Sequence, residues 1–234
     1  GIYSVSQRET QRRQKEIAIR KTAGAKTKEI IAMIKKGFNK ANVYENLTWA
    51  LESVNDNQLF KRPCVFLSHK REDKNACKEI AKYFKNAGID YYLDEEDDRL
   101  QHASSIGDPI QITESIKNGI KKSTHMMVVV SDKTYKSLWV PFEVGYGHAS
   151  ILDQEKLKNQ NDRIKLSVLT LKDIAEKALP DYLQVGYLIK GTKSLNEYIS
   201  KITDRLEKSL INESRIFSNN QMKHPLDSVL NWNL

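Results

Sequence analysis

The sequence has little cysteine and no long apolar run, and each absence removes a class of protein. Cys64 and Cys77 are the two cysteines and lack Cys-x-x-Cys spacing, so we expect small core residues in a reducing compartment and no zinc site or disulfide. The longest apolar stretches, such as residues 126–130, are far shorter than the roughly 20 residues that a membrane-spanning helix needs. Residues 1–10 lack the apolar segment of a secretory signal. We therefore expect a cytoplasmic protein without a membrane span.

Glycine-rich phosphate loops and metal-binding patterns are missing as well. The chain has neither Gly-x-Gly-x-x-Gly nor a Walker loop, so a dinucleotide would not be held as it is in a dehydrogenase. The acidic run at residues 94–98 lacks the alternating ligands and the glycine of a calcium loop. We expect this run to be a solvated, mobile loop that binds no metal.

The net charge of +8 invites a nucleic-acid interpretation, because clustered Lys and Arg bind phosphates. Its distribution weakens that interpretation. Residues 1–60 hold 11 Lys and Arg against 6 Asp and Glu, a balance of +5, whereas residues 61–234 hold 27 against 24, a balance of +3. Nucleic-acid binding through residues 1–40 would rest on charge alone, so we do not expect it.

Hydrophobic spacing divides the chain into three parts. Apolar residues at helical intervals predict two helices over residues 7–37, broken near Gly24, and a third over residues 42–54. From residue 62 the pattern changes, and beyond residue 211 the chain is polar and reads as irregular. The predicted organisation is therefore a helical extension at 1–61, one α/β domain at 62–210, and a tail at 211–234.

Strands alternate with helices in the central part. Strands are predicted over residues 64–68, 89–93, 124–131, 163–171 and 182–189, and helices over 74–87, 112–122, 141–152 and 194–209. A long polar connection, residues 94–109, separates the second strand from the second helix. This alternation predicts a parallel sheet covered by helices on both faces, with the very apolar residues 124–131 at its centre.

Three motifs resemble those of the Toll/interleukin-1 receptor (TIR) domain family. They are Phe66-Leu67-Ser68-His69 followed by Asp73, the second-strand segment at residues 88–94, and the strand-to-helix segment at residues 131–143. The most specific feature is the spacing Trp139-x-x-x-Glu143, since TIR enzymes carry a catalytic glutamate at this position. The resemblance implies a flavodoxin-like α/β fold, in which a central five-stranded parallel sheet has helices on both faces.

The resemblance also implies an activity of the bacterial, NAD-consuming type. Glu143 would cleave the nicotinamide–ribose bond of NAD, a substrate and not a cofactor, to give nicotinamide and ADP-ribose or a cyclic isomer, in immune signalling or virulence. Nicotinamide leaves as a neutral molecule, and a carboxylate stabilises the positive charge that builds on the ribose. The alternative is that Glu143 only favours a helix start through the helix dipole, worth about 0.3 to 1 kcal/mol.

Residues after the first two predicted strands are candidates for substrate binding. Ser68, His69 and Lys70 follow the first strand and Asp94 the second, where open α/β sheets bind ligands. Lys70 would suit the diphosphate electrostatically. Trp139 lies one helical turn before Glu143 and could offer an aromatic face to nicotinamide or adenine. The alternative is that the Trp139 side chain packs in the hydrophobic core and has no role in binding.

The same resemblance implies assembly into a homo-oligomer. In place of the Arg-Asp-x-x-Pro-Gly loop of animal receptors, this chain has the acidic run and Gly107-Asp108-Pro109, a pattern closer to bacterial TIR proteins. Such a loop would meet a neighbouring subunit and help to complete its site, with Ser104, Gly107 and Asp108 as the contact. A non-catalytic TIR–TIR interaction module remains the alternative function, and an assay of nicotinamide release separates the two.

Overall fold

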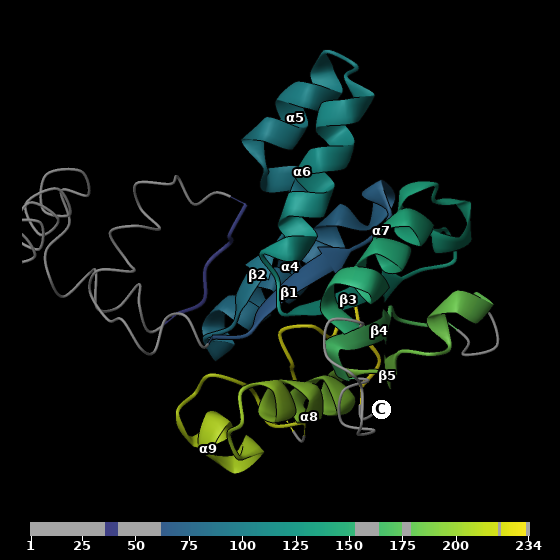
Figure 1. Cartoon of the computed structure of the whole chain (residues 1–234). Coiled ribbons are helices and arrows are strands. Elements are labelled where there is room, and N and C mark those ends of the chain that lie inside the picture. Colours follow the sequence, from purple (N-terminus) through teal and green to yellow (C-terminus); the bar gives the residue numbers. More distant parts are fainter. Residues whose placement is uncertain (1–35, 42–61, 153–163, 175–178, 220, 233–234) are drawn as a thin grey trace, which may run out of the picture.

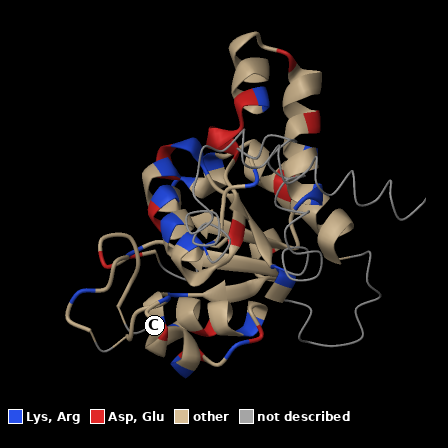
Figure 2. Ribbon diagram, turned by 90° about the vertical axis from the view of Figure 1, so that its left-hand side faces the viewer, with Lys and Arg blue, Asp and Glu red and all other residues tan. Residues whose placement is uncertain are grey.

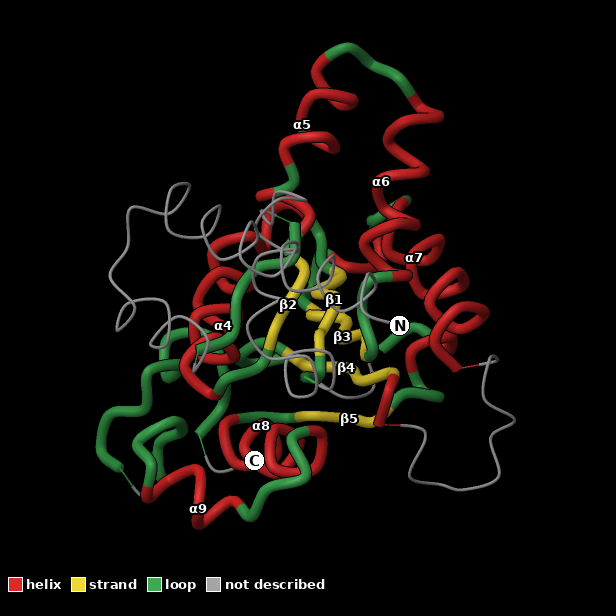
Figure 3. The backbone as a smooth tube through the Cα atoms, turned by 60° about the vertical axis from the view of Figure 1, so that its left-hand side comes forward, coloured by secondary structure: helices red, strands yellow, loops and turns green. Residues whose placement is uncertain are grey.

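The computed structural model describes residues 36–41, 62–152, 164–174, 179–219 and 221–232. In these ranges a parallel sheet has five strands in the order β2-β1-β3-β4-β5, which confirms the predicted sheet (Figures 1 and 3). The strands are β1 (Cys64–Ser68), β2 (Asp90–Tyr92), β3 (His125–Val130), β4 (Leu166–Thr170) and β5 (Tyr187–Ile189). The apolar β3 lies at the centre, as predicted.

Helices cover both faces of the sheet. One face packs against α4 (Lys74–Ala87), α8 (Thr192–Ile202) and α9 (Glu207–Asn212). The other packs against α5 (Asp98–Ser105), α6 (Pro109–Lys121) and α7 (Trp139–Gly147), which continues into a π-helical turn, His148–Leu152. The two layers confirm the α/β architecture.

Alternation along each buried strand supplies the two cores. In β3, Met127 and Val129 belong to the core under α4, whereas Met126 and Val128 belong to the core under α7. Successive side chains of a strand point to opposite faces, so a strand covered on both sides needs apolar residues at every position. This is why β3 appears in the sequence as a continuous apolar run.

The connection between β2 and α6 is helical, so the prediction of a mobile loop at residues 94–98 is wrong. Asp94–Glu96 forms a 3-10 turn, η2, and α5 follows it directly. Asp97 is buried and caps α5 by accepting hydrogen bonds from Arg99 N at 2.9 Å and Leu100 N at 3.3 Å. Helices α5 and α6 form a hairpin that projects from the sheet (Figure 1).

The C-terminal part differs from its prediction in two ways. The helix predicted over residues 194–209 is divided into α8 and α9, because the backbone turns at Asp204, whose φ is 53°. Beyond α9 the described chain has no helix or strand, yet it is not a separate tail. Ile216, Leu226 and Leu230 are buried in the core under α4.

Of the residues before 62, the structure describes residues 36–41. The second of the two helices predicted over residues 7–37 is not present at residues 36–37. The rest of that pair and the helix predicted over residues 42–54 lie outside the described part. Residues 36–41 run beside β2, where Asn39 forms a parallel bridge with Tyr91. Across the described ranges, no helix combines the length and the hydrophobicity that crossing a membrane requires.

Candidate active site

Glu143 is a buried carboxyl group on the helix that follows the central strand. Helix α7 begins at Trp139, so Glu143 lies in the second helical turn, where it is 3% exposed. The helix dipole acts on charges in the first turn and falls off beyond it. The alternative interpretation, that Glu143 only stabilises a helix start, therefore does not fit the structure.

Ser68 joins Glu143 to the end of β1. Its hydroxyl Oγ donates a hydrogen bond of 2.5 Å to Glu143 Oε2, and Ser68 is 1% exposed. Helix α7 packs against both β1 and β3 and brings the two residues together, although they are 75 positions apart. A charge-assisted bond of this kind favours the ionised carboxylate.

Burial and, to a smaller extent, the negative charge of Asp94 nevertheless raise the pKa of Glu143 to about 8, although the Ser68 hydroxyl acts to lower it. Loss of hydration penalises a buried charge, and a like charge nearby adds to that penalty. A carboxyl group that titrates close to neutral pH is typical of functional sites.

His69 lies against the acidic turn η2. Its Nδ1 is 3.0 Å from the carbonyl oxygen of Leu67 and 3.9 Å from Asp94 Oδ1, and its Nε2 is 4.0 Å from Glu95 Oε1. His69 Nε2 and Glu95 Oε1 are both buried without a hydrogen-bond partner among the described residues. Burial raises the pKa of Asp94 and His69 opposes this. The structure thus brings Ser68 into contact with Glu143 and places His69 beside Asp94, whose charge acts on Glu143.

Lys70 and Trp139 have different surroundings. Lys70 Nζ lies 3.5 Å from Glu72 Oε1, and in the described ranges no hydrogen bond or ion pair joins its side chain to Ser68, Asp94 or Glu143. Trp139 is 42% exposed and meets the edge of the Phe142 ring at 5.8 Å between centroids. Because α7 begins at Trp139, its side chain shares a helix side with Glu143 four residues later. This exposure argues against the core alternative, and contact with substrate stays a prediction.

Of the three proposed assembly residues, Ser104 lies in the last turn of α5, whereas Gly107 and Asp108 lie between α5 and α6, at the end of the hairpin far from the sheet (Figure 1). Asp108 caps α6 by accepting hydrogen bonds of 3.0 Å from Ile110 N and Gln111 N, and Gly107 has a left-handed φ of 67°. These roles shape the turn. The same end of the hairpin exposes Ile106 by 56% and, in the first turn of α6, Ile110 by 74%, two apolar residues that the sequence reasoning missed.

Sequence reasoning also missed the partners of the acidic turn. The acidic segment lies where β2 leads into the hairpin (Figure 2), and Asn39 Nδ2 donates a hydrogen bond of 2.7 Å to Glu96 Oε2. The two residues are 57 positions apart, so no local pattern marks the contact. Throughout the described part of the chain, no group of three or more His, Cys, Asp or Glu residues could hold a metal ion.

Comparison with known proteins agrees with the fold. Residues 65–184 match the TIR domain family. Over 134 residues the chain is 28% identical to a protein from Methanobrevibacter olleyae named "Probable 2' cyclic ADP-D-ribose synthase TcpO", covering 56% of this chain and 37% of the relative. The chain thus spans little more than a third of that protein's length. With a family match over half of its residues and the expected parallel sheet, the chain belongs to the TIR domain family.

Proposed function

We propose that the chain consumes NAD and that Glu143 is its catalytic residue, cleaving the nicotinamide–ribose bond. The observation that carries this proposal is a buried carboxyl group, hydrogen-bonded to Ser68, in the helix that follows the central strand. Open α/β sheets bind ligands at the carboxyl ends of their strands, where Ser68 lies. The name of the relative, a cyclic ADP-ribose synthase, supports the same substrate class.

The reaction needs charge stabilisation more than proton transfer. When the carbon–nitrogen bond breaks, its electron pair moves to the pyridinium nitrogen, so nicotinamide leaves neutral. Positive charge is left on the anomeric carbon and the ring oxygen, and ionised Glu143 stabilises it. Attack by water, with loss of a proton, gives ADP-ribose; attack by a nucleophile of the same ADP-ribosyl group gives a cyclic isomer.

The neighbouring residues prepare this carboxylate and its substrate. Ser68 favours ionised Glu143 through its hydrogen bond, and a ribose hydroxyl can take its place when substrate binds. His69 Nε2 and Glu95 Oε1, which are buried and unpaired in the described structure, are available to a further hydroxyl of the substrate. NAD is thus a substrate, and no resident cofactor is part of the proposal.

The substitution Glu143→Gln tests the proposal, because it removes the charge and keeps the shape. Mass analysis of NAD incubations should show nicotinamide release lowered by at least about a hundredfold, the scale for loss of one electrostatic group at a reacting centre. Glu79→Gln, at an exposed position of α4, removes a charge elsewhere and should leave release unchanged. Wild-type turnover by purified Glu143→Gln would overturn the catalytic assignment.

The folded state of Glu143→Gln should be at least as stable as that of the wild type at neutral pH. Burial raises the pKa of Glu143 to about 8, so the native protein holds this proton more tightly than the unfolded chain does. The stability that Glu143 contributes is complete below its ordinary pKa and is lost as the pH rises towards 8. A thermal melt therefore separates a loss of chemistry from a loss of fold.

We also propose assembly through the hairpin of α5 and α6. The exposed Ile106 and Ile110 at its end favour contact with a neighbouring copy. The same contact would serve a non-catalytic interaction module. Absence of nicotinamide release from concentrated, assembled wild-type protein would favour that alternative.

A further inference from the structure

Residues 36–41 lie along the outer side of β2, the strand at one edge of the sheet. Tyr91 N donates to Phe38 O at 3.1 Å, and Lys40 N donates to Tyr91 O at 2.8 Å. Gly37 N donates to Lys85 O at 2.9 Å, and a Cβ atom on Gly37 would lie 1.7 Å from the carbonyl oxygen of Ile89. This segment is therefore fitted against β2 with no room for a side chain at its closest point.

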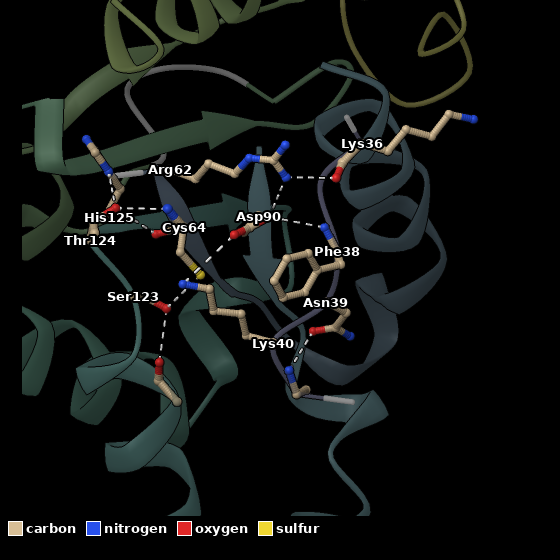
Figure 4. A network of polar contacts seen from close by, with 12 residues as sticks. Lys36, Phe38, Asn39, Lys40, Arg62, Cys64, Asp90, Ser123, Thr124 and His125 are labelled. Atoms are coloured by element: carbon tan, nitrogen blue, oxygen red, sulfur yellow. Dashed lines mark hydrogen bonds and ion pairs between the residues drawn. The ribbon is translucent and has the colours of Figure 1, made fainter. Parts of the chain in front are cut away.

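A buried carboxylate fixes the segment in place (Figure 4). Asp90 is 1% exposed and accepts a hydrogen bond of 3.2 Å from Phe38 N. Lys40 Nζ and Arg62 Nη1 lie 3.9 Å and 3.8 Å from its oxygens, and Arg62 also donates to Lys36 O at 3.0 Å. Burial raises the pKa of Asp90 to about 6, and the two cations and the backbone amide offset part of the cost of burying its charge.

Asn39 extends this anchorage to the acidic turn η2. Its Oδ1 accepts a hydrogen bond of 3.2 Å from Leu93 N, and its Nδ2 donates one of 2.7 Å to Glu96 Oε2. Leu93 and Glu96 flank Asp94, whose carboxylate faces His69 and acts electrostatically on Glu143. One side chain therefore holds both ends of the turn that carries Asp94.

The other hydrogen bonds of this turn are local. In the described part of the chain, Glu96 N bonds to Leu93 O, Asp97 N to Asp94 O, and Gln101 Nε2 to Asp94 O. The Tyr92 hydroxyl, on the buried strand directly before the turn, also donates to Asp97 Oδ2. Among the described residues, Asn39 supplies the hydrogen bonds that reach the turn from a distant part of the sequence.

We propose that Asn39 is a positioning residue for the reaction, holding η2 so that the Asp94 carboxylate keeps its place between His69 and Glu143. The inference rests on the proposed function, since the reaction concerned is that of Glu143. It extends the site to Asn39, although Asn39 touches no reacting atom.

A donor–acceptor exchange tests the contact. Asn39→Asp keeps the oxygen that accepts from Leu93 N but sets a carboxylate against Glu96. We expect kcat/KM for NAD to fall about tenfold, the scale of one hydrogen bond to a charged group. Adding Glu96→Gln restores the bond with donor and acceptor reversed, and kcat/KM should return to within about twofold of the wild type.

Three further measurements separate positioning from mere structural damage. Asn39→Asp should move the rising, acidic limb of the pH profile of kcat/KM to lower pH, because the Asp94 charge shifts away from Glu143. Glu96→Ala breaks the same bond from a half-exposed position and should act in the same direction. Lys36→Ala, which removes an exposed side chain and keeps the backbone contact of its carbonyl, should leave kcat/KM and the profile unchanged.

Hydrogen–deuterium exchange of the full chain gives a readout that needs no turnover. The amides of residues 93–97 should exchange faster in Asn39→Asp and recover in the double variant. An active wild type with unchanged exchange and pH profile in Asn39→Asp would overturn the positioning role. A different result would be faster exchange in Asn39→Asp that recovers in the double variant, with no nicotinamide release from the wild type or from either variant. That result would support the contact between Asn39 and Glu96 and would overturn the proposed function.

Discussion

Among single residues, Glu143 and Asp94 show why neighbouring charges matter to the proposed reaction. Glu143 must be ionised to stabilise a positive ribose, yet burial and then Asp94 raise its pKa to about 8. The kcat/KM for NAD should therefore rise with pH and level off above about pH 8, since this parameter reports ionisation of the free enzyme.

Asp94→Asn should move that limb to lower pH. The substitution removes the like charge that raises the pKa of Glu143, while keeping the size of the side chain. Rates of nicotinamide release measured from about pH 5.5 to about pH 9.5 would show the shift. An apparent pKa that is the same in both proteins would mean that Asp94 does not act on the ionisation of Glu143.

Trp139→Ala separates binding from stability. Truncating a buried tryptophan lowers the free energy of unfolding by about 3 to 5 kcal/mol. Trp139 is 42% exposed, so the melting temperature of the Trp139→Ala variant should differ little from that of the wild type. We expect lower turnover with a raised KM, because the ring lies one helical turn before Glu143. Tyr135→Ala, at a 66% exposed ring, is the control. A large fall in melting temperature would favour a core role, and unchanged melting with unchanged turnover would leave the ring with neither role.

The sequence was informative for residues that lie within short motifs. Ser68 and Glu143 were identified because each belongs to a segment that resembles a known family, and the structure places them in contact. Asn39 had no such mark, because its partners Leu93 and Glu96 are 54 and 57 positions away. Such a contact depends on residues 36–41 lying beside β2 in the folded protein, and the local spacing of residues in the sequence does not predict this arrangement.

At the level of elements, polarity was a poor guide to the segment after β2. Because charged residues dominate the acidic run, its composition predicts a loop, yet Asp97 caps α5, and Asp108 with Pro109 begins α6. An Asp before a helix and a Pro at its first position are start signals that the sequence does contain. Composition cannot distinguish a solvated loop from a short polar helix, whereas capping residues can.

Two helical glycines give a matched test of packing. A Cβ atom on Gly119 in α6 would lie 2.4 Å from Tyr92 Cε1, whereas one on Gly145 in α7 would meet nothing within 4 Å. Gly145→Ala should stabilise the protein by about 0.5 to 1 kcal/mol, the helix preference of alanine over glycine. Gly119→Ala should destabilise it by about 1 to 3 kcal/mol through overpacking.

Denaturant unfolding of the two glycine variants would measure both effects. Equal gains in stability would show that the Tyr92 ring moves aside without cost. Equal losses would instead show that α7 also needs a glycine at position 145.

For the whole molecule, the limits of the domain depend on the C-terminal residues. The sequence placed the end of the domain at residue 210 because later residues are polar on average, but Leu230 is 1% exposed in the core. Leu230→Ala should cost about 2 to 5 kcal/mol of unfolding free energy, as for other core leucines. Met222→Ala, 99% exposed in the same segment, should change it by less than about 0.5 kcal/mol.

Chemical unfolding of the Leu230→Ala and Met222→Ala variants decides whether residues 211–234 are a tail or part of the domain. Equally small effects would support the boundary that average polarity indicated. The parallel sheet itself was predictable, because strands buried on both faces must be continuously apolar.

Assembly should appear as a dependence of activity on protein concentration. If the hairpin completes a neighbouring site, specific activity should rise with concentration, and Ile110→Lys should move that rise to higher concentration. Met222→Lys, at a comparably exposed residue, is the control. Constant specific activity from nanomolar to high micromolar protein, with a monomer seen throughout by light scattering, would contradict assembly.

Some buried contacts of α4 can form only late in translation, because their partners lie near the C-terminal end of the sequence. The hydroxyl of Tyr83 lies 3.1 Å from His224 Nε2, a residue 141 positions later in the chain. At about 5 to 20 residues per second, the ribosome takes on the order of ten seconds to supply that partner. Until then, the surface of α4 that will meet residues 216–230 stays open to water and to other nascent chains. The proposed active site is translated well before the core beneath α4 can close.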